Sequence, residues 1–356
     1  MAKVLMKGNE AIGEAAIRAG CLNYFAYPIT PQSEVAEYLS KRLPEVGGVF
    51  LQGESEVAVG YMIFGASGAG ERVMTTSSSP GISLMSEAIS YIAAAECPAV
   101  FVNIMRGGPG LGGILPSQGD YFQATKGGGH GDYHLMVLAP DGVQEAVEMT
   151  MQAFTLAEKY RNPVMILGDG MIGQMMEPVE FRDDLKTEPS NKDDWATNGM
   201  STRKSKKPNL VKSLFLDSTE LNQHNMNLKA KYEQMKKEDV QYELYNADGE
   251  YQILLASYGT MSRVCRTAID MLKEEGIEAA MFRPKTLFPF PEKQVHDAAA
   301  KDSCKCVISI EMSMGQMVED VQRCVMGKKP VEFYGECGGE IPSPEKIIEI
   351  VKELIG

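Results

Sequence analysis

The sequence predicts an α/β protein: a parallel sheet with helices on both faces, followed by a second, smaller α/β unit. Three observations lead to this class. Short apolar runs alternate with helix-like segments and Gly-rich connections between residues 8 and 175, strand-like runs nearly vanish from about 178 to 248, and the alternation returns after residue 251. Strands that alternate with helices form parallel sheets. We therefore expect domains at residues 1–180 and 249–356, joined by a charged, partly helical connection at 181–248.

The individual elements follow from hydrophobic periodicity and from the turn residues that interrupt it. Helices are expected at residues 8–19, 30–39, 57–66, 82–95, 142–160 and 262–274. Strands are expected at residues 24–26, 49–51, 73–76, 100–105, 137–138, 164–167, 253–258, 279–282 and 307–310. Segment 57–66 is apolar nearly all round, which is typical of a buried helix.

The connection between the two units has few strand-like runs and more charged residues. Leu221, Leu228, Tyr232 and Met235 stand at roughly helical spacing and predict one amphipathic helix packed across the surface. A basic cluster at residues 203–207 is most simply a solvated loop. The segment 283–289 is expected to leave its strand in a proline-rich turn.

Composition restricts the classes of function. The chain has 356 residues, a net charge of −13 and a pI near 5.0, which argues against nonspecific nucleic-acid binding. Its seven cysteines include no C-x-x-C pair, whereas an iron–sulfur cluster usually needs four thiolates at recognisable spacing. We expect no cluster in this chain. Scattered thiols, with neither a signal peptide nor a long apolar segment, predict a cytoplasmic protein outside the membrane.

Two short motifs stand at the ends of predicted strands. In the first, Pro28 and Pro31 stiffen the run 27–31, so Thr30 should lie at a strand's carboxyl end, where open parallel sheets bind ligands. Its hydroxyl could also cap the following helix. In the second, Glu56 begins an apolar helix after a short strand. From spacing alone, a helix-capping role and a functional role for this carboxylate are equally open.

Arg106 follows the apolar run 100–105 and should lie at the same sheet edge. Its guanidinium could hold a carboxylate through two parallel hydrogen bonds, or close a salt bridge at the domain edge. The glycines at 107–113 and 127–129 match no nucleotide-binding fingerprint, so we expect flexible loops over a site mouth. His130 and His134 could contact a substrate or partner, although surface histidines are commoner.

Several motifs occur in an order that resembles a known family. Tyr-Pro-Ile-Thr-Pro at 27–31 and Glu-Ser-Glu at 54–56 are followed by the runs at 77–81, 106–110 and 315–317. Together they resemble the pyrimidine-binding half of the thiamine diphosphate-dependent 2-oxoacid:ferredoxin oxidoreductases. Length and detail are most similar to the separate alpha subunit of the branched-chain (2-oxoisovalerate, or 3-methyl-2-oxobutanoate) enzymes. The second unit resembles the transketolase C-terminal domain.

The resemblance implies roles for particular residues. Glu56 would share a proton with N1′ of the cofactor's aminopyrimidine, whereas Glu54 would be a surface carboxylate. Thr30 and Arg106 would face the 2-oxoacid. The residues implied to contact thiamine diphosphate are Tyr27, Pro28, Ile29, Glu56 and Ser79.

The resemblance also argues against a metal site. Asp169, between two glycines, and Asn198 have almost the spacing of the motif that holds Mg²⁺ and diphosphate in thiamine diphosphate enzymes. The segment between them, however, carries Pro178 and a run of charge instead of a helix and then a strand. In the family this motif lies on a separate beta subunit. A beta subunit would therefore supply the Mg²⁺ site, and [4Fe–4S] clusters would lie on other subunits. A gamma subunit and a small ferredoxin-like subunit are implied as further partners.

The expected reaction is oxidative decarboxylation of a 2-oxoacid to an acyl-CoA, with coenzyme A as co-substrate and ferredoxin as electron acceptor. The substrate could be 2-oxoisovalerate, 2-oxoglutarate or pyruvate. Loop residues Leu111, Ile114 and Leu115 favour an apolar side chain, although Lys126 could reach in. A noncatalytic α/β scaffold in which Glu56 is only a cap remains an alternative, as does a transketolase-like enzyme without clusters.

Overall fold

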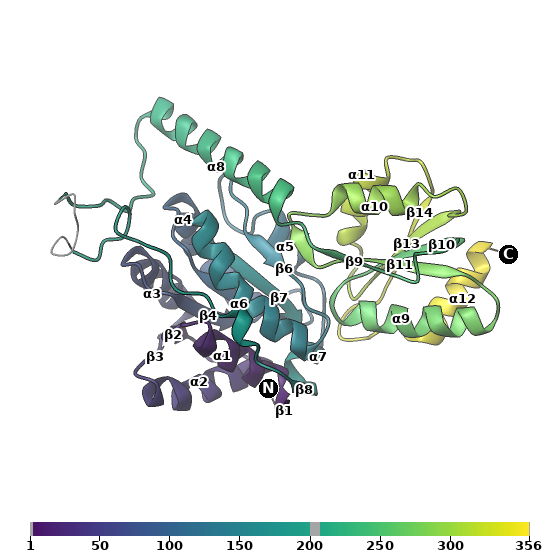
Figure 1. Cartoon of the computed structure of the whole chain (residues 1–356), viewed down its shortest axis with the longest axis horizontal. Coiled ribbons are helices and arrows are strands. Elements are labelled where there is room, and N and C mark those ends of the chain that lie inside the picture. Colours follow the sequence, from purple (N-terminus) through teal and green to yellow (C-terminus); the bar gives the residue numbers. More distant parts are fainter. Residues whose placement is uncertain (1–2, 200–206, 356) are drawn as a thin grey trace.

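The computed structural model describes residues 3–199 and 207–355. Within them the chain forms the predicted α/β architecture: a seven-stranded sheet and a five-stranded sheet lie side by side, as Figure 1 shows, and a two-stranded sheet completes the fold. In this part of the chain no helix is long and apolar enough to cross a membrane. Apart from Lys207, the basic cluster at 203–207 lies outside the described residues.

The first unit carries most of the large sheet. Its strands are β1 (Val4–Lys7), β2 (Asn23–Ala26), β3 (Val49–Gln52), β4 (Val73–Ser77), β5 (Val100–Met105), β6 (Met136–Leu138), β7 (Val164–Asp169) and β8 (Met176–Val179). Its helices are α1 (Gly8–Arg18), α2 (Ser33–Glu45), α3 (Glu56–Gly68), α4 (Ser79–Ala94), α5 (Tyr121–Thr125), α6 (Val143–Tyr160) and α7 (Gly170–Gln174), followed by the 3₁₀ turn η1 (Asp183–Leu185). The antiparallel pair β1–β8, α5 and α7 were not anticipated from the sequence.

The order of the large sheet, β12-β6-β7-β5-β4-β2-β3, explains its two layers of helices. The chain moves outward from β2 to β3 and then returns across β2 to β4. Because crossovers between parallel strands are right-handed, α2 and α3 must cover opposite faces. Helix α1 packs against α2 and α6, and α3 packs against α4. The reversal of direction between β2 and β4 is a switch point, where open α/β sheets bind their ligands.

The second unit contains the five-stranded sheet, ordered β14-β13-β10-β11-β9 and parallel except for β9. The five strands of this sheet are β9 (Tyr242–Tyr245), β10 (Ile253–Ala256), β11 (Ala279–Pro284), β13 (Cys306–Glu311) and β14 (Val331–Gly335). A sixth strand from this part of the chain, β12 (Thr286–Phe288), belongs to the large sheet. Its helices are α9 (Gly259–Glu274), α10 (Glu292–Ala299), α11 (Met317–Val325) and α12 (Pro344–Ile355).

Segment 283–289 corrects the expectation of a proline-rich turn. Residues 286–288 form β12, which leaves the second unit and pairs antiparallel with β6 of the large sheet. The reason is tertiary: β6 is flanked by β7 on one side only, so its other edge is covered by this short strand. The second unit is therefore joined to the first by shared backbone hydrogen bonds.

The connection contains the expected amphipathic helix, α8 (Ser218–Glu238), which runs along the outside of the first unit toward the second (Figure 1). Three of the four residues predicted to face the protein, Leu228, Tyr232 and Met235, are buried, but Leu221 is 41% exposed. The Nε2 atom of His224 lies 2.8 Å from the Ala94 carbonyl oxygen and fixes the helix against the end of α4.

Helix α3 departs from the prediction of a helix buried all round. One face packs on α4, but Val57 and Tyr61 on the other are 41% and 39% exposed. Val57 and Tyr61 stand four residues apart, so they share one face of the helix, and that face is exposed at both positions. The apolar character of this helix therefore reflects an exposed apolar surface as well as a core.

Candidate active site

The candidate site is built where several strands of the large sheet end. The loop after β2 contains residues 27–32, β4 ends at Ser77 and leads directly into α4, and Arg106 follows β5. These strands are parallel, so their carboxyl ends meet at one edge of the sheet. The switch point between β2 and β4 lies within this set. The structure thus brings the predicted motifs at 27–31, 77–81 and 106–110 to one edge.

Glu56 is the first residue of α3 and is only 7% exposed. The helix cap is the neighbouring Ser55, whose Oγ accepts the Ala58 amide hydrogen at 3.3 Å. A capping role for the Glu56 side chain is therefore not what the structure shows. Among the described residues, its carboxylate has no hydrogen-bond or ion-pair partner. Glu54, two residues earlier, is exposed as expected and accepts a hydrogen bond from Ser55.

The Glu56 carboxylate packs against the first turn of α4. A Cβ atom built on Gly81 would lie 2.7 Å from Glu56 Oε1 and 2.1 Å from Ser77 Oγ, so only glycine leaves room for both. Ser77 Oγ is itself buried and has no hydrogen-bond partner. The Glu56 carboxylate and the Ser77 hydroxyl therefore lie close together at the switch point without a hydrogen-bond partner among the described residues. A fully buried polar group such as this hydroxyl is costly unless a ligand satisfies it.

Arg106 is 7% exposed and bridges two loops through its guanidinium. Nη1 donates to the Thr30 carbonyl oxygen at 2.9 Å and Nη2 to the Leu111 carbonyl oxygen at 3.1 Å, while Nε is buried without a partner. Within residues 3–199 and 207–355 no carboxylate forms an ion pair with it. The alternative of a salt bridge at the domain edge is thus wrong. A buried guanidinium without a counter-charge is suited to binding an anion.

Thr30 lies in this loop with its side chain exposed, and its backbone carbonyl holds Arg106. It does not cap the following helix, because the residue before α2 is Gln32. Tyr27 and Pro28 are also exposed and Ile29 is half-buried. These side chains surround the sheet edge close to the switch point.

A cavity of about 550 Å³ opens beside Arg106. Residues of both units line it: Ser79, Pro80, Ser83, Arg106, Gly107, Gly108, Pro109, Gly110, Ser117, Gly119, Asp120, Gln123, Ser313, Met314, Gln316, Cys337 and Gly338. Glu56 and Thr30 are not among them. Arg106 and Asp120 are the charged lining residues in the described part of the chain. The cavity therefore has one cationic and one anionic wall.

The glycine-rich loop after Arg106 borders the cavity, but not with the residues that the sequence suggested. Residues 107–110 line the space, whereas Leu111, Ile114 and Leu115 do not and are 83%, 59% and 56% exposed. The loop is tied back by the hydrogen bond from Gly107 N to Leu115 O at 3.0 Å. The apolar lining that was inferred from these three side chains comes instead from Pro80, Pro109 and Met314.

Lys126 and the two histidines, which the sequence offered as possible substrate contacts, lie away from the cavity. Lys126 does not reach the cavity, because its ammonium lies 2.6 and 2.7 Å from the two Asp320 carboxylate oxygens. His134 does not face it either: its ring stacks on Phe288 at 4.2 Å, and burial lowers its pKa. His130 is exposed and packs edge-on against Tyr91. None of the three lines the cavity.

Asp169, in the motif that resembles a diphosphate site, has other partners in this chain. Its Oδ1 accepts the amide hydrogens of Met171 and Ile172, at 3.0 and 3.2 Å, and the Thr260 hydroxyl at 2.8 Å. Burial raises the pKa of this carboxyl, against these hydrogen bonds, which lower it. Asp169 therefore caps α7 and ties β7 to the start of α9.

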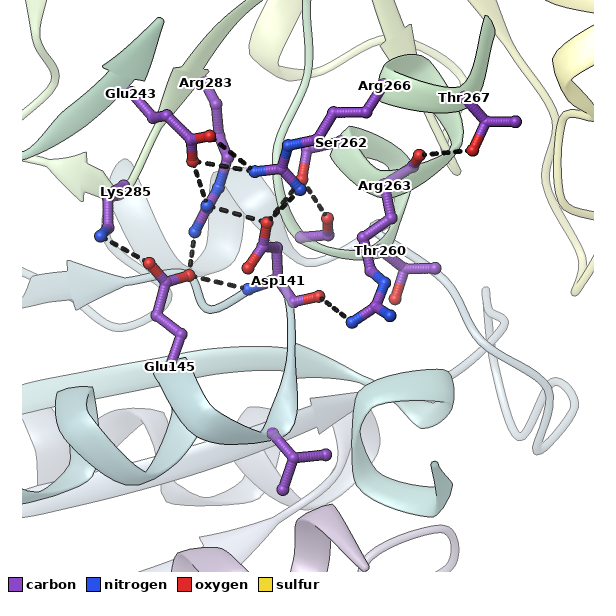
Figure 2. Close-up of polar contacts among 12 residues, drawn as sticks. Asp141, Glu145, Glu243, Thr260, Ser262, Arg263, Arg266, Thr267, Arg283 and Lys285 are labelled. Carbon is purple, nitrogen blue, oxygen red and sulfur yellow. Dashed lines mark hydrogen bonds and ion pairs between the residues drawn. The ribbon is translucent and has the colours of Figure 1, made fainter. Parts of the chain in front are cut away.

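A cluster of ion pairs holds the two units together beside this contact (Figure 2). Arg283, of which 2% of the side chain is exposed, lies 2.8 Å from Asp141 and 2.7 Å from Glu243 and also pairs with Glu145. Arg266 pairs with Asp141 at 2.6 Å. Although burial opposes the shift, Arg283 and Arg266 hold the pKa of Asp141 below its usual range.

The main residue that sequence reasoning missed is Asp120. Its Oδ2 accepts the Ser79 hydroxyl at 2.5 Å and the Asn103 amide at 2.9 Å. Burial raises the pKa of the Asp120 carboxyl, against these two hydrogen bonds, which lower it. Its neighbours Gln118 and Gly119 form polar contacts with the second unit, so the polar run 117–120 was the available signal. Gln316, which belongs to the run 315–317 named in the sequence analysis, lines the cavity.

Comparison with protein families identifies the class. Residues 14–244 match the family model described as pyruvate flavodoxin/ferredoxin oxidoreductase, thiamine diphosphate-binding, and residues 252–347 match pyruvate:ferredoxin oxidoreductase core domain II. The chain belongs to this family of 2-oxoacid:ferredoxin oxidoreductase subunits.

Individual relatives are similar over their full length. The chain is 47% identical over 356 residues to ketoisovalerate oxidoreductase subunit VorB of Methanothermobacter thermautotrophicus, covering 100% of this chain and 99% of the relative. It is 38% identical over 355 residues to 2-oxoglutarate synthase subunit KorA of Archaeoglobus fulgidus, covering 98% of each.

Solved structures confirm the fold. A 2-oxoglutarate:ferredoxin oxidoreductase from Magnetococcus marinus, with 2-oxoglutarate, coenzyme A and succinyl-CoA bound, superposes with a TM-score of 0.88 at 29% identity. The match covers 100% of this chain and 66% of that one, so this chain spans about two thirds of its length. A split-gene transketolase, at a TM-score of 0.61 and 13% identity, shares the fold alone.

Proposed function

We propose that this chain is the catalytic alpha subunit of an enzyme that oxidatively decarboxylates 2-oxoisovalerate (3-methyl-2-oxobutanoate) to an acyl-CoA, with ferredoxin as electron acceptor. The observation that carries the proposal is the buried, unpaired Arg106 in the interdomain cavity, in a chain 47% identical to a ketoisovalerate oxidoreductase subunit. A 2-oxoacid offers the carboxylate that this guanidinium lacks.

The residues at the switch point fit the aminopyrimidine end of thiamine diphosphate. Glu56 is a buried residue whose carboxylate has no hydrogen-bond partner among the described residues, and the buried Ser77 hydroxyl beside it also has none. Glu56 would hold or share a proton at N1′ of the pyrimidine, and Tyr27, Pro28, Ile29 and Ser79 would provide the walls of the site. Thiamine diphosphate, when bound, supplies the stabilised carbanion that the cleavage of a 2-oxoacid requires.

The substrate would bind beside this position. Arg106 would hold the carboxylate, and Thr30, whose carbonyl fixes Arg106, would present its exposed hydroxyl toward the 2-oxo group. Holding the acid at one end leaves its oxo carbon fixed for reaction, which is the contribution expected of a positioning cation.

The cavity favours a monocarboxylic over a dicarboxylic acid. Arg106 is the cationic lining residue among the described residues, and Lys126 is engaged by Asp320. The second carboxylate of 2-oxoglutarate would find no cation there, whereas the branched side chain of 2-oxoisovalerate could pack on Pro80, Pro109 and Met314. 2-Oxoglutarate remains the second candidate, since relatives 34–38% identical are 2-oxoglutarate synthase subunits.

Partner subunits complete the proposal. The diphosphate and Mg²⁺ would be held by a beta subunit, because Asp169 is already bound by donors of this chain. Such a subunit could pack on exposed apolar side chains of β3, α3 and α4, which are Val49, Leu51, Val57, Tyr61 and Leu84. The [4Fe–4S] clusters would lie on gamma and ferredoxin-like subunits. The seven cysteines are free, which suits the cytoplasm.

The test uses the complex formed when this chain is co-expressed with its partner subunits. Reduction of a viologen dye is measured with coenzyme A and a panel of 2-oxoacids, and the fastest turnover is expected with 2-oxoisovalerate. Glu56→Gln should lower the turnover by about 10²–10⁴-fold with assembly intact. Glu54→Gln, two residues away and exposed, is the matched control and should leave the rate unchanged. An active Glu56→Gln complex would support the scaffold alternative.

A further inference from the structure

Asp120 connects three elements at the wall of the cavity. It stands just before α5, but its side chain does not cap that helix. Instead Oδ2 accepts hydrogen bonds from Ser79 at the start of α4, at 2.5 Å, and from Asn103 on β5, at 2.9 Å. Its Oδ1 has no hydrogen-bond partner in the described chain. Asp120 and Arg106 line the same cavity without forming an ion pair with each other.

The hydrogen bonds around Ser79 have a defined direction. The hydroxyl has a single hydrogen, and Asp120 Oδ2 at 2.5 Å is a far better acceptor than the Arg106 carbonyl oxygen at 3.4 Å. With its hydrogen on Asp120, the Ser79 oxygen is free to accept the backbone N–H of Arg106, which lies at 3.1 Å. Asn103 Nδ2 can only donate, so it too requires an acceptor at Oδ2.

We infer that Asp120 is a positioning residue for substrate binding: through the Ser79 hydroxyl it fixes the backbone of Arg106, and thereby the guanidinium that holds the 2-oxoacid carboxylate. Ser79 accepts the Arg106 N–H where β5 ends and the glycine-rich loop begins, and among residues 107–110 only Pro109 has a side chain. The inference deepens the proposed function and rests on it.

The inference predicts which kinetic constant changes. The carboxylate that Arg106 would hold leaves as CO2 when its bond to the oxo carbon breaks, so this contact contributes mainly to substrate binding and little to the bond-breaking step. Loss of the position of Arg106 therefore raises KM and leaves kcat nearly unchanged. We call the chain of hydrogen bonds from Asp120 through Ser79 to Arg106 the relay. The Glu56 carboxylate, on the other side of the first turn of α4, makes no hydrogen bond to these residues and should keep its function.

The test compares Asp120→Ala, Asp120→Asn, Ser79→Ala and the Ser79→Ala/Asp120→Ala double variant in the assembled complex. We expect Asp120→Ala to raise KM for 2-oxoisovalerate about tenfold, the usual scale for loss of a charge-assisted hydrogen bond, with kcat within about twofold. Asp120→Asn, which keeps an acceptor oxygen for Ser79, should recover part of the loss. The double variant should be no worse than Asp120→Ala, because residues that act through one another are not additive.

Ser90→Ala is the matched control. Ser90 lies on the same helix and donates one hydrogen bond, to the His130 carbonyl oxygen at 2.6 Å, but it does not line the cavity. An unchanged KM in Asp120→Ala, or additive effects of the two substitutions, would overturn the inference. So would a loss of kcat that tracks a lowered melting temperature of the complex.

A second measurement separates this inference from the proposed function. Hydrogen exchange of the peptide that contains Arg106 reports whether its amide is held, whatever acid the complex turns over. Asp120→Ala and Ser79→Ala should speed exchange there, and Ser90→Ala should not. If the wild-type complex oxidises no 2-oxoacid, the proposed function fails while the exchange result still decides the relay. Unchanged exchange in both variants would refute the relay.

Discussion

Gly81 gives the sharpest test of where the Glu56 carboxylate must lie. Glycine inside a helix normally costs up to about 1 kcal/mol relative to alanine, so Gly81→Ala would stabilise α4 if there were room. There is none: the added Cβ would stand 2.1 Å from Ser77 Oγ and 2.7 Å from Glu56 Oε1. The substitution therefore displaces the carboxylate without altering its chemistry.

The size of the displacement follows from the contact distances. Ordinary contact with a Cβ begins at 3.4 Å, so Glu56 Oε1 must move by about 0.7 Å even if α4 stays fixed. A misplacement of about 1 Å in a catalytic geometry can cost about 10²-fold in rate. We expect Gly81→Ala to lower kcat by about 10- to 100-fold in the dye-reduction assay, with little change in KM because Arg106 is untouched.

Gly65 provides the control for this prediction. It also lies within a helix, α3, but a Cβ built there meets no atom within 4 Å. Gly65→Ala should keep the full rate and should not lower the melting temperature. If Gly81→Ala keeps more than half of the wild-type kcat while thiamine diphosphate remains bound, the reasoning that Glu56 acts from its present position is refuted.

Three further outcomes are expected. Arg283→Met should lower the free energy of unfolding by about 1–3 kcal/mol, measured by urea denaturation, because it removes charged hydrogen bonds of a buried guanidinium while Arg266 and Lys285 still pair with the partly buried carboxylates; an equally stable variant would contradict this. Asp141 has a lowered folded-state pKa, so its contribution is present above the unfolded value of about 3.9 and is lost as pH falls through the folded value. Asp141→Asn should therefore be less stable than wild type at pH 7, with the gap closing in thermal melts below about pH 4. Lys126→Met should leave the ratio of kcat/KM for 2-oxoglutarate and 2-oxoisovalerate unchanged, since Asp320 holds the ammonium away from the cavity; a changed ratio would place Lys126 in the pocket.

Local pattern predicted the regular elements well where burial is continuous. The run 100–105 was expected as a strand and is β5 with the same bounds, because all six residues are buried in the middle of a parallel sheet. Strand β12 was not anticipated. Its three residues stand among prolines and pair with β6, about 150 residues earlier, so nothing local reveals the partner. Short strands of this kind are stabilised by tertiary pairing rather than by propensity.

The site residues show the same contrast between local sequence signals and tertiary contacts. Glu56 and Arg106 could be placed from the sequence, because each directly follows or begins an element with a clear apolar signal. Asp120 could not, since its partners lie 17 and 41 residues away and its role exists only once β5 and α4 are side by side. The cavity wall at 313–338 likewise depends on how the second unit docks on the first.

The first turn of α4 connects the two halves of the site. Gly81 contacts Glu56 and Ser77 on the side of the switch point, while Ser79, two residues earlier, contacts Asp120 and Arg106 on the side of the cavity. Gly81→Ala should therefore lower kcat and Ser79→Ala should raise KM, although both substitutions lie in one helical turn. If both changed the same constant, this turn would act as a single rigid support, and the separate roles assigned to Glu56 and Arg106 would not hold.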